Sequence, residues 1–529
     1  RLVGSEMCIR DSGRGAGWIY TYRWLDRLLS FVSIVVLARL LAPEDFGVVA
    51  IAASVVAILE GLSDFDVNRA LIRARSEDRE LYDSAWTLSV LRGVAAALLM
   101  VVVAPFIDDG RIRAILLVLS ISPLLHGLSN PRFVMFERHL IYPPLAVQTL
   151  SAKLISFGVT LAIALMYRSY WALVLGIIAS SLTSAILTYV LRPFRPRVSF
   201  SRFSEIFAFS GWMSLTTMVT TLSMQTDRII VGRLLGVADA GAYYMTQRVG
   251  VVPTAELISP LQRILFPSFS EIAEDRERLR RAVRESINVL GSLSLPAGVG
   301  FALVANDFVP LALGATWTMI VPLLQVLVPF LGVRAALSMT LPCVMALGRT
   351  RLLFGVSLVY ALIHLPAFIA GTALYGLPGA IWSIVLAGIA YSLLNAWMLH
   401  RTLGISISEI FTQLRRPLLA VGLMTIAIFA ADYVLPLDLF TQRGSWLPLV
   451  IKVVLGGIAG ILIAQVALWW LPGDWKRDPF ALAPRLPAPL SFLAPESLRV
   501  SQSSEPATHV THKPATTPAA ETAGHLANQ

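Results

Sequence analysis

Apolar runs of about 20 residues recur along most of this chain, and each is long enough to cross a hydrocarbon core of about 30 Å as an α-helix. This feature constrains the fold most. Of the 529 residues, 56% are hydrophobic and only 14% are charged, with a mean hydropathy of +0.71. A water-soluble domain of that composition would lack the polar surface to cover itself. The chain is therefore expected to be a membrane protein.

Helices are favoured over strands because lipid offers the backbone no partners and the alternation typical of a barrel strand is missing from the sequence. The runs predict about fourteen spanning helices. The net charge of +10 follows from arginines in short loops, so membrane orientation explains it better than nucleic acid does. The predicted spans are 18–41, 45–66, 84–106, 112–135, 145–167, 170–191, 205–235, 239–267, 286–310, 319–346, 352–374, 376–400, 417–436 and 447–471.

Arginines concentrate in every second loop, and the loops between are nearly bare. Short cytoplasmic loops carry the Lys/Arg excess in membrane proteins. The arginine-rich loops, and with them both termini, are therefore predicted to be cytoplasmic. The arginines of these loops are Arg69, Arg73, Arg75, Arg79, Arg132, Arg138, Arg192, Arg195, Arg197, Arg202, Arg276, Arg278, Arg280, Arg281, Arg284, Arg349, Arg351, Arg401, Arg415 and Arg416.

One short stretch occurs twice, as VVLARLLAPEDFG at 35–47 and as DRIIVGRLLGVADAG at 227–241. Aligning Arg39 with Arg233 also matches the two leucines, the aspartate and the glycine that follow. Each copy ends one apolar helix with an arginine, turns within a few residues and starts another. The repeat predicts two related membrane lobes with their arginines at equivalent helix ends.

The predicted organisation follows from the spans and the repeat. The charged stretch 267–285 is expected to be a cytoplasmic linker or a short surface helix. The first residues lack the apolar core of a signal peptide, and the last ones are rich in Pro, Ala, Ser and Thr. The expected parts are an N-terminal cytoplasmic tail at 1–17, an N-lobe of six helices at 18–204, a C-lobe of six helices at 205–404, two further helices at 405–472, and a disordered cytoplasmic tail at 473–529.

Ionisable side chains inside spans are costly, so they usually face a bundle interior or a water-filled cavity. Lys153 enters the fifth predicted span, and His126 and His364 are expected to be core residues rather than proton relays. A guanidinium matches phosphate in bidentate geometry. The arginines expected to line a cavity and bind an anionic ligand are Arg27, Arg248, Arg334, Arg23 and Arg228, and the acids expected to serve in coupling or gating are Asp26, Asp64, Asp227 and Glu256.

A structural role is the alternative for these charges, with Arg248 paired to Asp64 across the lobes, for instance. The sequence contains no P-loop, HExxH or GxSxG motif, and no outward loop is long enough to build an active site. Cys8 and Cys343, the only cysteines, suggest neither a metal site nor a disulfide framework. The chain is therefore expected to be a transporter rather than an enzyme, with no cofactor.

Four motifs carry a family resemblance: ARLLAPEDFG at 38–47, DSAWTLSVLRG at 83–93, DRIIVGRLLG at 227–236 and FPSFSEIAED at 266–275. They resemble the polysaccharide-exporter branch of the multidrug/oligosaccharidyl-lipid/polysaccharide (MOP) flippase superfamily, and more narrowly the Wzx-type lipopolysaccharide and exopolysaccharide flippases. The resemblance covers about 18–471.

This resemblance implies an all-α MATE-like fold, with two pseudo-symmetric six-helix lobes followed by two helices. It implies a bacterial inner-membrane flippase that moves undecaprenyl-pyrophosphate-linked oligosaccharide to the outer leaflet, working beside a polysaccharide polymerase and export machinery. Arg23, Asp26, Arg27 and Arg248 are the closest positional counterparts of the family's charged residues. Without an ATPase motif, energy is expected from an H+ or Na+ gradient or from the membrane potential.

Three other functions stay open from the sequence. A lipid II flippase is a close sibling within the same superfamily. A cation-coupled drug exporter would need acids to dominate the cavity, whereas arginines outnumber them in the central spans. A membrane glycosyltransferase or polymerase would need a sizeable outward loop.

Overall fold

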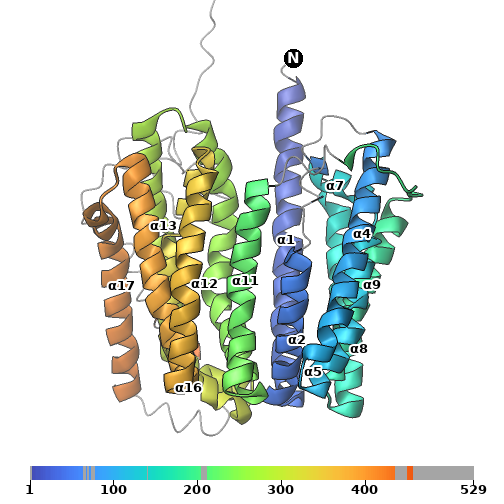
Figure 1. Ribbon diagram of the computed structural model, residues 1–529. Helices are drawn as coiled ribbons and strands as arrows, with labels where there is room; N and C mark the ends of the chain where they lie inside the picture. The colour runs from blue at the N-terminus through green and yellow to red at the C-terminus, as the bar shows by residue number, and fades with distance from the viewer. Residues whose placement is uncertain are drawn as a thin grey trace, which may run out of the picture. The chain divides into compact units, whose positions relative to one another are not determined.

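The computed structural model describes residues 3–62, 67, 71–72, 78–139, 141–203, 211–434, 450–454 and 456. Every regular element within these residues is a helix (Figure 1), which confirms the all-α prediction. Eight helical stretches in this part of the chain are long and apolar enough to cross a membrane. The helices are divided here in chain order into the N-terminal group (α1–α9) and the C-terminal group (α11–α17), and α2 of the first group packs against α11 and α12 of the second.

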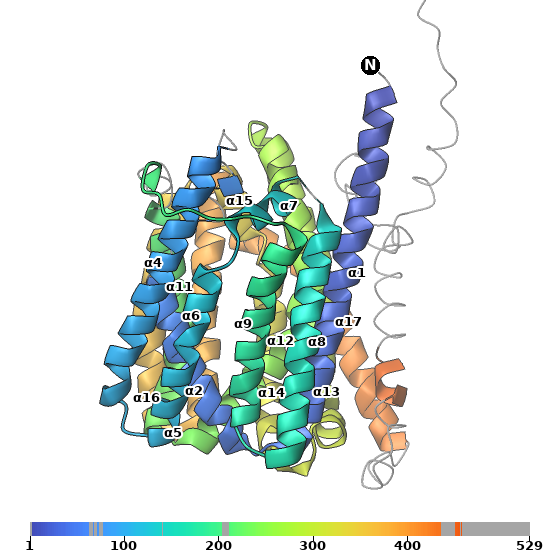
Figure 2. The same ribbon diagram turned by 90° about the vertical axis from the view of Figure 1, so that its right-hand side faces the viewer.

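In the N-terminal group, α8 packs against both α1 and α9, as Figure 2 shows, while α4 packs against α6 and α2 against α5. The elements of this group are α1 (Val3–Leu40), α2 (Pro43–Leu62), α4 (Arg79–Val103), η1 (Ala104–Phe106), α5 (Gly110–Leu119), α6 (Ile121–Gly127), η2 (Pro131–Phe133), α7 (Val134–Arg138), α8 (Tyr142–Tyr167) and α9 (Trp171–Leu191).

In the C-terminal group, α13 packs against α12, α14 and α17, and α11 packs against α16. Gly376 breaks α16 with a backbone φ of 62°, close to the predicted boundary between the spans 352–374 and 376–400. The elements are α11 (Gly211–Leu234), α12 (Val237–Glu271), α13 (Arg276–Ala312), η3 (Ala315–Ile320), α14 (Val321–Ala336), α15 (Thr340–Ala346), α16 (Thr350–Leu403) and α17 (Ile407–Val434).

The span predicted at 112–135 ends earlier than predicted: α5 and α6, which break at Ser120, together form one candidate membrane span (Gly110–Gly127), and a second break separates it from η2 and α7. Asn130 explains the second break. Its carboxamide oxygen accepts from the Arg132 N–H (2.9 Å), and its Nδ2 donates to the carbonyl of Thr188 on α9 (3.2 Å). A side chain that caps the turn and ties it to α9 holds the backbone out of the helix.

Neither alternative predicted for 267–285, a cytoplasmic linker or a separate short surface helix, describes this stretch, because the neighbouring helices extend into it. α12 continues to Glu271, and α13 begins at Arg276 after an N-cap by Asp275, whose carboxylate accepts from the Arg278 N–H (3.0 Å). The charged residues form the first turns of this 37-residue helix. Its buried face, which starts with Leu279, runs on without interruption into the apolar part of the helix, so nothing ends the helix between the two parts.

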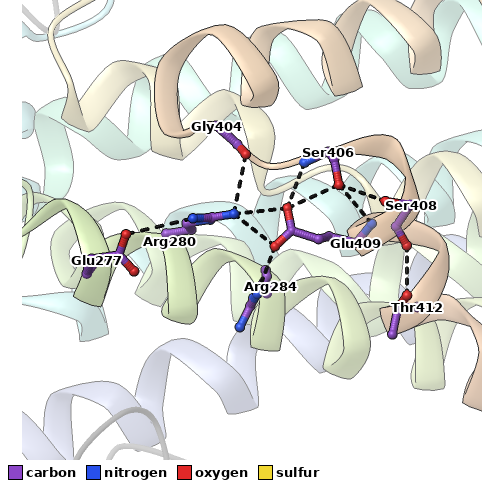
Figure 3. Close-up of polar contacts among 8 residues, drawn as sticks. All are labelled: Glu277, Arg280, Arg284, Gly404, Ser406, Ser408, Glu409 and Thr412. Atoms are coloured by element: carbon purple, nitrogen blue, oxygen red, sulfur yellow. Dashed lines mark hydrogen bonds and ion pairs between the residues drawn. The ribbon is translucent and has the colours of Figure 1, made fainter.

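The last fully described helix, α17, begins at Ile407 rather than at the predicted 417, so the two arginines placed in a loop there, Arg415 and Arg416, lie within it. Ser406 and Glu409 form a capping box: the Ser406 N–H donates to Glu409 (2.8 Å), and the Glu409 N–H donates to the Ser406 hydroxyl (3.3 Å). Arg280 and Arg284 of α13 both bind the Glu409 carboxylate (2.9 Å each; Figure 3), which fastens the start of α17 to α13.

The two groups meet where the repeated motif predicts symmetry. Gly47 lies in the first turns of α2 and Gly241 in the first turns of α12. A Cβ on Gly47 would lie 2.8 Å from the carbonyl carbon of Val237, and one on Gly241 would lie 2.8 Å from the carbonyl carbon of Pro43. The contact is reciprocal, so only glycine at both positions permits this approach, which we call the glycine crossing.

Arg39 and Arg233 lie in the last turns of α1 and α11, so the prediction of equivalent helix ends is confirmed. The Arg39 guanidinium donates to the carbonyls of Leu311 and Ala312 at the end of α13, and Arg233 binds Asp108 after α4 (2.7 Å). Each arginine thus reaches a helix end in the opposite group. The Trp317 indole N–H adds a further link to the Ala38 carbonyl (2.8 Å).

Candidate functional site

Four charged side chains from both groups form a cluster of opposite and like charges. Asp26 on α1 lies 3.8 Å from the Lys153 ammonium on α8. The guanidinium groups of Arg27, next to Asp26, and of Arg248, on α12, both interact electrostatically with that ammonium. We call Asp26, Arg27, Lys153 and Arg248 the charge cluster. It brings together two of the predicted binding arginines, one predicted acid, and a lysine that the sequence marked only as an intramembrane charge.

The charge cluster is accessible although its residues lie within long apolar helices. Arg27 and Arg248 are exposed, and Lys153 and Asp26 are half-buried. Arg23 lies one helical turn before Arg27 on α1. Its Nε is buried without a hydrogen-bond partner among the described residues, and its guanidinium lies 5.7 Å from the Tyr22 ring centroid. The charge cluster thus brings three cations and one carboxylate together.

Arg228 lies apart from the charge cluster, where the two groups of helices meet. Its Nη1 donates to the Gln225 side chain (2.9 Å) and lies 3.5 Å from the Ser54 hydroxyl on α2. Its guanidinium also lies 5.2 Å from the centroid of the Tyr244 ring. These contacts make Arg228 an interface residue that reaches from α11 toward the N-terminal group.

Arg334 ends a row of aromatic side chains inside the C-terminal group. Its guanidinium lies 5.8 Å from the Tyr391 ring centroid, and that ring lies 4.8 Å from the ring of Tyr360. Tyr360 in turn stacks on the imidazole of His364 (5.2 Å between centroids). The structure therefore joins Arg334 to a polar network of α14 and α16 rather than to the charge cluster.

Asp227 forms the polar end of this network. The His364 Nε2 lies 2.9 Å and 3.1 Å from its two carboxylate oxygens, and the Tyr243 hydroxyl donates to one of them (3.1 Å). The Gln247 amide donates to that hydroxyl (2.5 Å). His364 is buried, as a core residue would be, but its ring is paired with an acid. No local pattern signals a pair 137 residues apart, so sequence reasoning missed it.

Two predicted acids cannot be placed. Asp64 lies outside the described residues, and with it the alternative pairing of Arg248 to Asp64. Glu256 belongs to α12, but its side chain lies outside what the structure describes. The prediction that His126 is a core residue is wrong, because its side chain on α6 is exposed and lies 3.7 Å from the Glu60 carboxylate of α2.

The helix arrangement defines the class of protein. It matches the lipid II flippase MurJ in an inward closed conformation with a TM-score of 0.68, covering 87% of this chain and 99% of MurJ at 14% identity. It also matches an inward-facing multidrug resistance MATE family transporter of the MOP superfamily with a TM-score of 0.55, covering 73% of this chain and 96% of that chain at 16% identity. At these identities the likeness shows the fold alone: this is a multi-pass membrane protein with the MurJ- and MATE-like fold.

The sequence comparisons define a family that is narrower than the fold. Residues 36–322 match the polysaccharide biosynthesis protein family, and the chain belongs to it. It is 26% identical to the lipopolysaccharide biosynthesis protein WzxC of Escherichia coli (strain K12) over 417 residues, 76% of this chain and 84% of WzxC. It is 25% identical to the succinoglycan biosynthesis transport protein ExoT of Rhizobium meliloti (strain 1021) over 427 residues, 78% and 85% of the two chains. Its named relatives, which include a succinoglycan transport protein and a putative O-antigen transporter of Shigella flexneri, are transporters rather than enzymes.

Proposed function

We propose that this protein flips an undecaprenyl-pyrophosphate-linked oligosaccharide from the inner to the outer leaflet of the bacterial inner membrane. The charge cluster is the observation that carries the proposal. Its cations come from α1, α8 and α12, so both groups of helices would hold the same ligand. A diphosphate offers enough negative charge and oxygen atoms to engage several cations at once, and guanidinium groups bind it in bidentate geometry.

The accessible position of these cations supports a transported ligand more than a structural role. A buried ion pair that only stabilises a bundle is normally closed to solvent and balanced in charge. Here Arg27 and Arg248 are exposed, and the described cluster has three cations and one acid. A lipid-linked pyrophosphate would bind these accessible cations from both groups of helices at once.

The proposed binding set is wider than the charge cluster. Arg23 extends it by one turn along α1. Arg228 would interact with the ligand from its position at the interface between the two groups of helices. Arg334 would be linked to the ligand through the row of aromatic side chains that ends at Asp227. The full set keeps Arg27, Arg248, Arg334, Arg23 and Arg228 as substrate-binding cations, and Asp26, Asp64, Asp227 and Glu256 as coupling or gating acids.

Alternating access is the proposed mechanism, with about fourteen spanning helices in two pseudo-symmetric six-helix lobes followed by two helices. The contacts of Arg39, Arg233 and the glycine crossing all lie at the end of the helices away from the arginine-rich loops. With those loops and both termini in the cytoplasm, the described conformation would be closed toward the outside. Opening that end and closing the other would pass the ligand across.

The names of relatives agree with a glycan precursor as cargo. Besides WzxC and ExoT, the chain is 23% identical over 415 residues to the putative O-antigen transporter of Shigella flexneri, covering 71% of this chain and 95% of that protein. These names favour a polysaccharide intermediate over a drug as the substrate. A polymerase and export machinery for the same polysaccharide are the proposed partners downstream.

Binding of the pyrophosphate lipid is the direct test. The purified protein would be titrated with undecaprenyl pyrophosphate, and with undecaprenol as a lipid that lacks phosphate. Arg27→Ala and Arg248→Ala should each weaken binding by tens- to a hundred-fold, as expected when a charged hydrogen bond worth about 2–3 kcal/mol is lost. Arg→Lys should rescue only in part, because an ammonium lacks the bidentate fork.

Arg278→Ala provides the matched control, because Arg278 is an exposed arginine in the first turn of α13 and does not belong to the charge cluster. This variant should bind like the wild type. Equal affinity of the wild type for undecaprenol and undecaprenyl pyrophosphate would refute the proposal. So would normal polysaccharide export in cells that carry both Arg27→Ala and Arg248→Ala at wild-type protein levels.

A further inference from the structure

We infer that residues 192–203, which we call the strap, dock on the anionic phospholipid headgroups at the membrane surface. The strap follows α9, and Figure 2 shows it crossing from the end of α9 to α4. Residues 193–200 have no regular secondary structure, because Pro193 and Pro196 have no N–H and a fixed φ and cannot continue α9. The inference goes beyond the proposed function, since it concerns lipids that surround the protein rather than the lipid that it would carry.

Side chains of α4 hold the backbone of the strap. The Asp83 carboxylate accepts a hydrogen bond from the Arg197 N–H (2.9 Å), and the Thr87 hydroxyl accepts one from the Ser199 N–H (3.0 Å). Both acceptors are buried. They belong to the motif DSAWTLSVLRG at 83–93, which contributes nothing to the charge cluster. This motif therefore fixes one conformation of the strap and one surface that it presents.

The strap lies at the level of the lipid headgroups. Leu182, Ile186 and Val190 follow one another by four residues on α9 and are 44%, 51% and 65% exposed, so this face of the helix contacts lipid. The apolar face ends just before the strap begins. Non-helical backbone exposed to lipid is unstable in the hydrocarbon region, which offers no hydrogen-bond partners. The strap therefore lies where the hydrocarbon region ends.

An aromatic pair supports the same level. The Trp86 Nε1 of α4 donates to the Tyr189 hydroxyl of α9 (3.1 Å), and that hydroxyl donates to the Leu128 carbonyl (2.7 Å). Trp and Tyr concentrate at membrane–water interfaces, because the ring favours apolar surroundings while its polar atom needs a hydrogen bond. Trp86 directly precedes Thr87, which holds the strap, so the pair and the strap lie at the same level.

The exposed side of the strap combines arginines with apolar side chains. Arg195 and Arg197 are exposed, and within the described part of the chain neither guanidinium forms an ion pair. Val198 and Phe200 are 71% and 59% exposed. Segments that lie in the membrane interface have this composition, because their apolar side chains enter the acyl boundary while their cations stay at the phosphates.

Two further arginines lie beside the strap on aromatic rings. The Arg132 guanidinium lies 4.9 Å from the ring centroid of Phe194, a residue of the strap, and 5.4 Å from that of Tyr82. The Arg192 guanidinium lies 5.5 Å from the Phe136 ring centroid. A ring fixes the position of a guanidinium without neutralising its charge. These arginines therefore add to the positive potential of the strap.

The acids near the strap already face other arginines. The Asp83 carboxylate lies 3.6 Å from Arg79, and the Asp78 carboxylate lies 3.6 Å from Arg202. The positive charge of the strap is thus available to an external anion. A membrane surface fits better than an acidic protein, because the strap continues the lipid-facing side of α9 and presents apolar side chains between its cations.

The test measures which lipid gathers at the strap. The full chain, with Cys8 and Cys343 replaced by serine, would carry a fluorophore at Ser201→Cys, an exposed position of the strap. Nanodiscs of phosphatidylcholine would contain a small fraction of either phosphatidylglycerol or phosphatidylcholine that bears a quenching nitroxide near its glycerol backbone. Quenching then reports the local concentration of each lipid. Phosphatidylglycerol should be enriched by about fivefold for each exposed arginine, or about 25-fold for two, and high salt should lower the enrichment.

Arg195→Gln and Arg197→Gln should each lower the enrichment by about fivefold, and the double variant should bind the two lipids equally. Arg168→Gln is the matched control, because it removes an exposed arginine that precedes α9 and so lies at the opposite end of that 21-residue helix from the strap. It should keep the full enrichment. Thr87→Val removes the hydroxyl that holds the Ser199 N–H and should lower the enrichment although both arginines remain.

Equal quenching by the two lipids with the strap arginines intact overturns the inference, and so does an enrichment that the double variant retains. Inorganic phosphate that abolishes the enrichment, when chloride of equal ionic strength does not, also overturns it, because the strap would then bind a free anion. An acidic protein as occupant would appear as polysaccharide export lost in the double variant without any lipid preference in either protein, which again contradicts the inference. The quenching needs no carried lipid, so its outcome is separate from that of the proposed function.

Discussion

The glycine crossing gives the sharpest prediction about conformational change. Gly47→Ala would place a methyl group 2.8 Å from the carbonyl carbon of Val237 and closer still to its oxygen. An ordinary van der Waals contact needs about 3.4 Å, so the first turns of α2 and α12 must separate by more than about 0.6 Å. Gly241→Ala produces the same overlap with Pro43 from the other side.

The expected magnitude follows from two opposing terms. Overpacking of this kind costs about 1–3 kcal/mol, and replacing glycine by alanine inside a helix returns about 0.5–1 kcal/mol. The net cost of about 0–2.5 kcal/mol, centred near 1.2 kcal/mol, falls on the conformation that contains the crossing, so its population should drop by about eightfold. The separation that relieves one overlap also relieves the other, so the double variant should cost less than the sum.

The measurement is the distance between spin labels at Phe106→Cys and Met319→Cys at one fixed pH. Gly47→Ala and Gly241→Ala should each add a longer distance, and the double variant should resemble the singles. Gly158→Ala is the control, because no atom lies within 4 Å of the added methyl group on α8. Distance distributions of Gly47→Ala that match those of the wild type and of Gly158→Ala would refute the reasoning.

Three further predictions concern stability and orientation. Glu409→Gln removes the acid that Arg280 and Arg284 share (Figure 3) and should lower the Tm of the purified protein by several degrees. The control is Glu277→Gln, which changes an acid that is 74% exposed and 3.7 Å from Arg280 and should leave the Tm unchanged; equal Tm values in both variants would contradict the stabilising role of Glu409. Lys452→Met removes the ammonium that lies 2.7 Å from the buried Asp307 carboxylate and should cost about 3–5 kcal/mol of stability. The double variant with Asp307→Leu should regain most of this stability in thermal unfolding, and no recovery would contradict the stabilising role of the Lys452–Asp307 pair. A cysteine at Val198, which is 71% exposed in an arginine-rich loop, should resist an impermeant thiol reagent added to intact cells, and labelling there would reverse the proposed orientation.

Sequence reasoning predicted the helical class and most helix positions, because a membrane solvent requires long apolar helices and leaves few alternatives. It placed Arg39 and Arg233 at equivalent helix ends from a short repeat. It failed where local side chains decide the backbone, as at Asn130, which caps a turn inside the predicted end of a span, and at the capping box before α17. Hydropathy averages over some 20 residues do not detect one capping side chain.

What the sequence determined by itself is the set of elements and the unusual charges within them. The sequence alone identifies Arg27 and Arg248 as unusual charges, because a guanidinium inside an apolar span is costly and needs a partner or a cavity. Which charges meet was decided only by the tertiary structure. Packing of α1, α8 and α12 brings Lys153 to the two arginines, and packing of α11 on α16 pairs Asp227 with His364. Contacts between residues about a hundred or more positions apart produce no periodic pattern in the sequence, because helix packing rather than local propensity sets them.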